Sequence, residues 1–143
     1  MPVGTEPGGA ALPDELARAM PPGGRLLLPV LLPDADLDWA VHRPSGPPPA
    51  PGPRGLREPT GDRLGVDAIR DTELIIVPAL AVGRTGVRMG RGGGSYDRVL
   101  ARATAAWTVA LLHDGELLDH VPAEAHDRRV HAVITPSGGL VRL

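Results

Sequence analysis

The sequence predicts an α/β fold with a largely parallel sheet. Apolar runs with strand character alternate along the chain with short helical patterns, and parallel strands need such crossover helices between them. Clusters of proline and glycine separate these runs and mark the turns between elements. The length of 143 residues suits one domain that buries about 68–70% of its unfolded surface. We therefore expect a single domain over residues 1–143.

The first half of the chain carries one helical signal and two strand signals. Leu12–Met20 predicts a short helix, because Pro13 stands in its first turn and Asp14 is favourable to the helix dipole there. The continuous apolar run Arg25–Leu32 predicts a strand that is covered on both faces. Leu37–Val41 predicts a second, shorter strand.

Residues 44–53 form a segment of unusual composition, with six prolines and two glycines. Such a composition favours an extended surface loop without a packed core. Neither flank is long enough to fold alone, so we interpret the segment as a surface loop within one domain rather than as a linker between two.

The second half alternates strand and helix signals more regularly. Strands are expected at Leu74–Val77, Trp107–Leu112, Val130–Thr135 and Leu140–Leu143, and a helical turn at Asp67–Arg70. A helix is expected over Ser95–Ala105, because four apolar or aromatic residues recur there at helical spacing. These residues are Tyr96, Val99, Leu100 and Ala103.

Composition and charge exclude several classes of protein. The net charge of −2 gives no sign of a general nucleic-acid or membrane-surface binder. No cysteine is present, so neither a disulfide framework nor a thiol nucleophile is available. The longest apolar run is far short of a membrane span, and no secretory signal pattern is visible. We expect a cytoplasmic protein without a nucleic-acid or membrane partner.

The Gly-rich segment Met89–Arg98 carries the clearest chemical signal. Glycines let the backbone N–H groups approach a ligand closely, and the following helix begins with unpaired N–H donors, which together favour an anion such as phosphate. The segment is not a Walker loop, because all 15 basic residues of the chain are arginines. It is not a dinucleotide fingerprint either, because Ser95 replaces the third glycine. A flexible turn is the alternative, but Arg88, Arg91 and Arg98 favour phosphate binding.

Two carboxylates stand near possible phosphate sites. Asp97 falls in the first turn of the expected helix, where it either favours the helix dipole or serves as a Mg²⁺ ligand beside a phosphate. Asp127, in the polar loop Pro122–Arg129, is a candidate for a second metal carboxylate. The histidines in this region are His120, His126 and His131. Their spacing fits no common zinc motif, so we interpret them as solvated side chains.

Five segments, read in order, resemble the pattern of the 5-formyltetrahydrofolate cyclo-ligase family. They are Arg57-Glu58-Pro59, Ile75 to Gly83, Arg88 to Arg98, Pro122 to Asp127, and Ile134-Thr135. Their shared order and spacing are far more specific than any one segment, and the resemblance as a whole spans most of the chain, from about Thr5 to Thr135. The resemblance implies a three-layer α/β/α fold of the Rossmann-like, cyclo-ligase type. The Gly-rich loop would lie at the C-terminal end of a strand, where such sheets bind ligands.

The resemblance also implies a reaction of one-carbon metabolism. ATP and Mg²⁺ would drive the conversion of 5-formyltetrahydrofolate to 5,10-methenyltetrahydrofolate, with release of ADP and phosphate. The partners would be a reduced folate and ATP, and the protein a monomer. Such a reaction needs both substrates held together and the charge on the transferred group neutralised, more than covalent help from the protein.

Carried over position by position, the resemblance implies the following site. The ATP contacts would be Arg88, Met89, Gly90, Arg91, Gly92, Gly93, Gly94, Ser95 and Tyr96, of which Arg91 and Tyr96 would be catalytic. The folate contacts would be Glu6, Arg91, Gly92, Gly93, Gly94 and Ser95. The Mg²⁺ ligands would be Asp97 and Asp127.

The chain also departs from the family pattern. It begins after the N-terminal segment whose basic helix grips ATP in the family, so we expect an N-terminally truncated domain with weaker ATP affinity. Val82-Gly83 replaces the family's Phe-Asp, and Glu116 stands where a glutamine is common. Two alternatives follow: a non-catalytic nucleotide- or folate-binding homologue that has lost part of the ATP site, and a product that folds poorly because apolar sheet surface is exposed.

Overall fold

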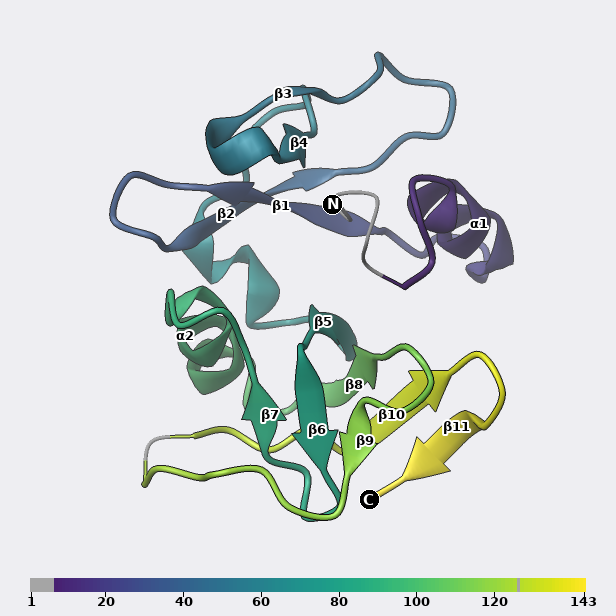
Figure 1. Ribbon diagram of the computed structural model, residues 1–143. Helices are drawn as coiled ribbons and strands as arrows, with labels where there is room; N and C mark the ends of the chain where they lie inside the picture. Colours follow the sequence, from purple (N-terminus) through teal and green to yellow (C-terminus); the bar gives the residue numbers. More distant parts are fainter. Residues whose placement is uncertain (1–6, 126) are drawn as a thin grey trace. The chain divides into compact units, whose positions relative to one another are not determined.

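The computed structural model describes residues 7–125 and 127–143 (Figure 1). The chain divides into two compact units, Met1–Ala68 and Ile69–Leu143. The expectation of one domain over residues 1–143 stays a prediction. Within the described ranges, no helix combines the length and the apolar character that crossing a membrane requires.

The first unit contains helix α1 (Leu12–Ala19) and a hairpin of strands β1 (Leu27–Leu31) and β2 (Leu37–Val41). The strands pair antiparallel along their whole length. Burial alternates along β1, with Leu28 and Val30 buried and the other three residues of the strand half-buried. The prediction of a strand covered on both faces is therefore wrong, because an antiparallel hairpin buries one face more than the other.

One side-chain contact joins α1 to the end of the hairpin, and one backbone hydrogen bond closes the turn between the two strands. His42, directly after β2, places Nε2 at 2.7 Å from Asp14 Oδ1 in α1. The tight turn between β1 and β2 places Ala35 at a φ of 64°, a left-handed conformation that strains a residue with a Cβ. The Ala35 N–H donates to the Leu32 carbonyl there at 3.0 Å.

The Pro-rich segment ends in a second small hairpin. Residues 44–49 form no helix or strand, and strands β3 (Ala50–Pro51) and β4 (Arg57–Glu58) flank a short 3-10 helix, η1 (Pro53–Gly55). The carboxylate of Glu58 accepts a 2.9 Å hydrogen bond from the Leu31 N–H at the end of β1. The acid–proline segment Arg57-Glu58-Pro59 therefore connects the two hairpins of this unit.

The second unit is built on a four-stranded sheet with the order β11-β10-β8-β5. Its strands are β5 (Leu74–Pro78), β8 (Trp107–Leu111), β10 (Ala132–Thr135) and β11 (Gly139–Arg142), and the 3-10 helix η2 (Val66–Ile69) precedes them. β5, β8 and β10 are parallel, whereas β11 joins β10 as an antiparallel edge. The three parallel strands carry much of the core, in residues Ile75, Val77, Val109, Ala110, Ala132 and Val133.

A separate three-stranded sheet contains three strands that the sequence did not predict. They are β6 (Ala81–Gly83), β7 (Arg88–Met89) and β9 (Leu117–Leu118), in the order β7-β6-β9. β6 pairs antiparallel with β7 and parallel with β9. A small buried cluster of Ala81, Val87 and Val121 accompanies this sheet. The sheet matters for the site because β7 leads directly into the Gly-rich loop.

Helix α2 (Ser95–Arg102) follows the Gly-rich loop. Its predicted apolar face is confirmed, since Val99, Leu100 and Ala103 are all buried. The helix ends at Arg102 rather than Ala105, because Ala103 leaves the helical conformation.

The fold as a whole is a mixed α/β fold, as predicted. The expected parallel pairing holds for β5, β8 and β10 and for β6 with β9, whereas the other pairings among the strands named above are antiparallel. The three-layer arrangement stays a prediction.

Candidate functional site

The Gly-rich loop joins β7 to α2 and is open on its outer side. Gly92 and Gly94 have positive φ angles of 83° and 67°, which glycine adopts without strain. Among the described residues other than Gly92 and its two chain neighbours, no atom lies within 4 Å of where a Cβ on Gly92 would stand. Gly94 is the N-cap of α2 and supplies no side-chain cap to the N–H groups of the first turn. This arrangement suits an anion.

Arg88, at the start of β7, lies beneath this loop rather than on its surface. Its side chain is only 5% exposed. Arg88 Nη2 donates to Asp97 Oδ1 at 2.9 Å, and Nη1 donates to the Pro78 carbonyl at 3.2 Å. The guanidinium carbon lies 6.0 Å from the centre of the Tyr96 ring, within the range of a cation–π contact. Three residues predicted for the site, Arg88, Tyr96 and Asp97, are therefore in one group.

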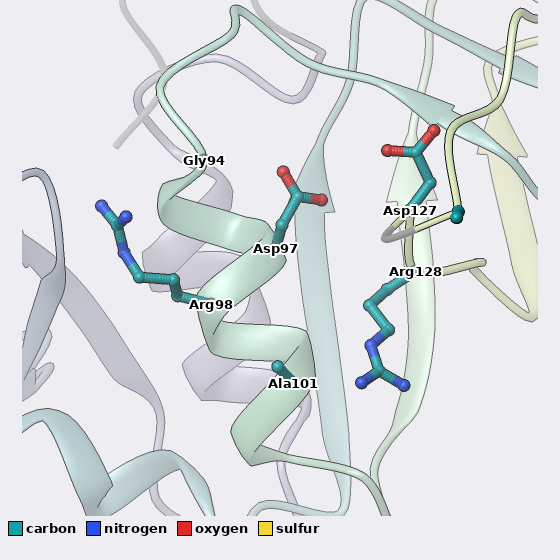
Figure 2. Close-up of a pocket in the computed structure, with 7 residues that line it drawn as sticks. Gly94, Asp97, Arg98, Ala101, Asp127 and Arg128 are labelled. Carbon is teal, nitrogen blue, oxygen red and sulfur yellow. The ribbon is translucent and has the colours of Figure 1, made fainter.

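A pocket of about 540 Å³ lies beside the N-terminal half of α2. It is lined by Gly94, Asp97, Arg98, Ala101, Ala125, Asp127 and Arg128 (Figure 2). Figure 2 shows Asp97 on the helix and Asp127 on the neighbouring loop, with both carboxylates at the same end of the pocket. The two predicted metal ligands, distant in sequence, thus line one pocket.

The loop holding Asp127 is shaped by that residue's own hydrogen bonds. Asp127 Oδ2 accepts a 2.6 Å bond from the Glu124 N–H, while the Asp127 N–H donates to the Glu124 carbonyl at 3.1 Å. These two bonds close a tight turn. The position of the Asp127 carboxylate at the pocket is therefore fixed by the backbone of its own loop.

The donor set of the pocket fits a hard divalent cation better than zinc. Two carboxylates supply oxygen ligands, and Mg²⁺ is usually held by one or two carboxylates together with waters and phosphate oxygens. Among the described residues, no group of three or more His, Cys, Asp or Glu side chains could hold a metal on its own. A metal here would need oxygens from a bound substrate.

The other predicted residues occupy different positions around the loop. Arg91 is exposed at the tip of the loop, and Met89 is exposed on β7, where it pairs with Ala81. Gly90 lies against Arg88, because a Cβ there would stand 2.7 Å from Arg88 Nη1. Glu6 lies outside the described residues, so its predicted folate contact stays a prediction.

Sequence reasoning missed one cation of the pocket. Arg128 lines it together with Arg98, which the sequence had marked only as a general anion-binding residue. The available signal was its position directly after Asp127. With the two carboxylates, these arginines give the pocket the mixed charge that a metal–phosphate ligand requires.

Two residues that depart from the family pattern have structural contacts. A Cβ on Gly83 would stand 3.1 Å from the Val121 backbone nitrogen, so a larger residue would push these segments apart. Glu116 Oε2 accepts a 2.7 Å bond from the His113 N–H and so closes the turn before β9. His131, interpreted as solvated, is exposed but places Nδ1 at 3.0 Å from the Thr108 backbone nitrogen, which donates to it.

Comparison with known proteins agrees with the family pattern found in the sequence. The model of the 5-formyltetrahydrofolate cyclo-ligase family matches residues 1–136. A 5-formyltetrahydrofolate cyclo-ligase of Mycolicibacterium smegmatis is 46% identical over 149 aligned positions, which cover all of this chain and 74% of that protein. The Escherichia coli K12 protein of the same name is 36% identical over 57% of this chain and 46% of its own length.

Solved structures show the same relationship. The NMR structure of 5,10-methenyltetrahydrofolate synthetase from Aquifex aeolicus matches with a TM-score of 0.77 and 26% identity, over 100% of this chain and 69% of that one. A 5,10-methenyltetrahydrofolate synthetase from Mycoplasma pneumoniae shares the fold at a TM-score of 0.55 and 14% identity, over 76% of this chain and 54% of that one. By its sequence motifs, its match to the family model and its relatives, the chain belongs to the 5-formyltetrahydrofolate cyclo-ligase family.

Proposed function

We propose that this chain converts 5-formyltetrahydrofolate to 5,10-methenyltetrahydrofolate, with ATP as the co-substrate and Mg²⁺ as the metal. The observation that carries the proposal is the pocket that Asp97 and Asp127 both line beside α2. Family membership supplies the reaction, and this pocket supplies a place for a metal–phosphate group. The frame would be the three-layer α/β/α arrangement of the family, which the likeness to the Aquifex aeolicus protein supports.

The role proposed for each residue follows from its position in the structure. Asp97 and Asp127 would hold Mg²⁺, and the backbone N–H groups of Gly92 to Ser95 would face phosphate oxygens. Arg91, exposed on the loop, would reach the transferred phosphoryl group with its fork of N–H donors. Tyr96, half-buried in the first turn of α2, would lie at the edge of the same site. The folate would approach the outer side of the loop.

In the proposed reaction, the formyl oxygen of the folate attacks the γ-phosphorus of ATP, and the bond from that phosphorus to the ADP oxygen breaks. The folate N10 then attacks the activated formyl carbon and closes the ring. The carbon–oxygen bond to phosphate breaks, phosphate leaves with the electron pair, and N10 loses its proton. Positioning and charge neutralisation supply most of the catalysis, because no covalent bond to the protein is needed.

The test is an assay of the purified chain with 5-formyltetrahydrofolate, ATP and Mg²⁺. We expect the absorbance of the methenyl product to rise, with one ADP formed per product and no rise when ATP or Mg²⁺ is omitted. Asp97→Asn should abolish most of this rate. Asp119→Asn is the matched control, because Asp119 is 90% exposed and does not line the pocket.

The same assay separates catalysis from simple binding. If the chain binds 5-formyltetrahydrofolate or ATP tightly but forms no methenyl product, it is a non-catalytic member of the family and the proposal is wrong. If it binds neither substrate while it unfolds cooperatively on heating, the pocket beside α2 is not the site of the family's reaction in this chain.

A further inference from the structure

We infer that Arg88 is a positioning residue, which holds the carboxylate of Asp97 in place for a metal ion, and that it does not itself contact the nucleotide. The inference rests on the proposed function, because it assigns a role within that site. Arg91 and Arg98 within the Gly-rich segment are exposed, whereas Arg88, directly before it, has a buried side chain that is 5% exposed. A phosphate would find almost no surface of this guanidinium to touch.

The two terminal nitrogens of Arg88 already have acceptors. Nη1 donates to the Pro78 carbonyl at the end of β5, and Nη2 donates to Asp97 Oδ1 in the first turn of α2. A guanidinium is planar, so these two bonds fix the direction of its fork. β5 is in turn paired with β8 along its whole length. Arg88 therefore ties the first turn of α2 to the end of a sheet strand.

Gly90 makes room for this arrangement. A Cβ on Gly90 would stand 2.7 Å from Arg88 Nη1 and 3.5 Å from the guanidinium carbon. Gly90 does not have a positive φ, unlike Gly92 and Gly94, so backbone conformation does not explain the glycine. The glycines of the loop thus have two purposes: Gly92 and Gly94 shape the backbone, and Gly90 leaves space for the buried guanidinium.

Burial of Arg88 is not explained by stability alone. Among the described residues, no hydrogen-bond partner is found for Arg88 Nε, which is buried. Leaving a buried donor of a charged group without a partner is unfavourable for folding. A side chain that is kept buried at such a cost is typical of a functional site, where the geometry of a neighbouring group matters more than stability.

The consequence for Asp97 is a fixed orientation. Its carboxylate has two oxygens, and Oδ1 is held by Arg88, so Oδ2 is left for another ligand in the pocket that Asp97 lines. Without Arg88, the carboxylate could rotate about both side-chain bonds and would lose this orientation. Removing a group that orients a metal ligand typically weakens metal affinity by about 10- to 100-fold.

The test compares nucleotide affinity with and without metal. Arg88→Met removes the guanidinium but keeps an apolar side chain of similar length. Gly90→Ala keeps the guanidinium but displaces it with the added Cβ. ATP affinity is measured by calorimetry in EDTA and in Mg²⁺, and binding of Mn²⁺ to the protein–ATP complex is measured by electron paramagnetic resonance. We expect ATP affinity in EDTA to stay within about two-fold of wild type, and Mn²⁺ affinity to fall about 10-fold or more in both variants.

Two further variants distinguish a positioning role of Arg88 from a merely structural one. The double variant Arg88→Met with Asp97→Asn should lose no more Mn²⁺ affinity than Asp97→Asn alone, which a merely structural effect would not produce. Arg88→Lys keeps a charge without the planar fork and should be intermediate, and it replaces Arg88→Met if that variant does not fold. A large loss of ATP affinity in EDTA, with unchanged Mn²⁺ binding, would show that Arg88 contacts phosphate and would overturn the inference.

The wild-type protein separates this inference from the proposed function. If wild type binds ATP equally well with and without Mg²⁺, the proposed metal site itself is wrong. If wild type depends on Mg²⁺ but Arg88→Met, Arg88→Lys and Gly90→Ala all keep its Mn²⁺ affinity, only the role of Arg88 is wrong.

Discussion

Asp97, in the first turn of α2, and Asp127, in the loop before β10, line the same pocket. One oxygen of each carboxylate is held by the protein, through Arg88 Nη2 for Asp97 and the Glu124 N–H for Asp127. Two carboxylates held in this way are suited to share a divalent cation with a bound phosphate. The pocket can therefore be tested one carboxylate at a time.

Asp97→Asn and Asp127→Asn should each raise the Mg²⁺ concentration that half-saturates activity, because an amide oxygen is a weaker ligand for Mg²⁺ than a carboxylate. The measurement is a Mg²⁺ titration of methenyl product formation at saturating ATP. Asp119→Asn, in the same unit but exposed outside the pocket, should titrate like wild type. If the Mg²⁺ titration of either pocket variant matches that of wild type, the substituted aspartate does not hold Mg²⁺ and its role is structural only.

Arg91→Ala should weaken ATP binding by about 1–3 kcal/mol, the value of one charge-assisted hydrogen bond. The fold should be unaffected, because Arg91 is exposed. Calorimetric titration with ATP and Mg²⁺ measures the effect. Arg25→Ala, also at an exposed arginine but in the first unit, is the control and should leave the affinity unchanged. If Arg91→Ala binds ATP as tightly as wild type does, Arg91 does not contact ATP.

Acid pH should remove a stabilising contact between two turns of the second unit. Hydrogen bonds from the hydroxyl and the backbone N–H of Ser137 to Asp114 Oδ1, at 2.7 and 3.1 Å, lower the pKa of the Asp114 carboxyl below its ordinary value of 3.8. Because the folded-state pKa is depressed, the contribution to stability is complete above pH 3.8. It is lost as the pH falls through the folded-state pKa.

This shift can be read directly from an NMR titration of the Asp114 carboxyl carbon. The midpoint in the folded protein should lie below 3.8, and Ser137→Ala should move it back toward that value. The unfolded chain in urea provides the reference. A midpoint at or above 3.8 in the folded wild-type protein would contradict the prediction.

Ala35→Gly should stabilise the first hairpin by up to about 1 kcal/mol. Ala35 has a φ of 64°, where a Cβ is unfavourable, so glycine relieves strain that exceeds its own entropic cost. Chemical denaturation of both proteins measures the difference. Ala40→Gly, in the middle of β2, should instead destabilise, because glycine weakens a strand interior. A less stable Ala35→Gly variant would show that the turn does not strain Ala35.

The parts of the fold that the sequence predicted are those with a long or strong local pattern. Helix α2 was predicted because Val99, Leu100 and Ala103 show helical spacing, and all three are buried. Strands β3, β4, β7 and β9 have two residues each, which is too short for any periodicity to appear. Such strands are set by their partners, which a local pattern does not show.

The antiparallel pairing of β1 with β2 could not be predicted from the sequence either. Leu32 to Asp36 form a tight turn that contains no glycine, although Ala35 adopts a positive φ. The usual hairpin signal, an Asn-Gly or Asp-Gly pair, is therefore missing. The apolar run before this turn was interpreted as a fully covered strand, and only the antiparallel register with β2 corrects that.

The composition of the site was more predictable than its geometry. The family resemblance pointed to Asp97 and Asp127, and the structure places both on one pocket. It could not indicate that Arg88 is buried, because a sequence shows a charge but not its acceptors. The burial depends on the Pro78 carbonyl and on the missing Cβ of Gly90, which are three-dimensional features.

The most direct test of the central claim is to locate a metal–nucleotide complex on the protein. Mn²⁺ takes oxygen ligands as Mg²⁺ does and broadens the NMR signals of nearby nuclei, and the 14.9 kDa chain is small enough for assigned spectra. With ATP and a trace of Mn²⁺, we expect broadening of the backbone signals of Gly94, Asp97 and Asp127, and its loss in Asp97→Asn. Broadening centred elsewhere in the chain, or unchanged in Asp97→Asn, would contradict the assignment of this pocket.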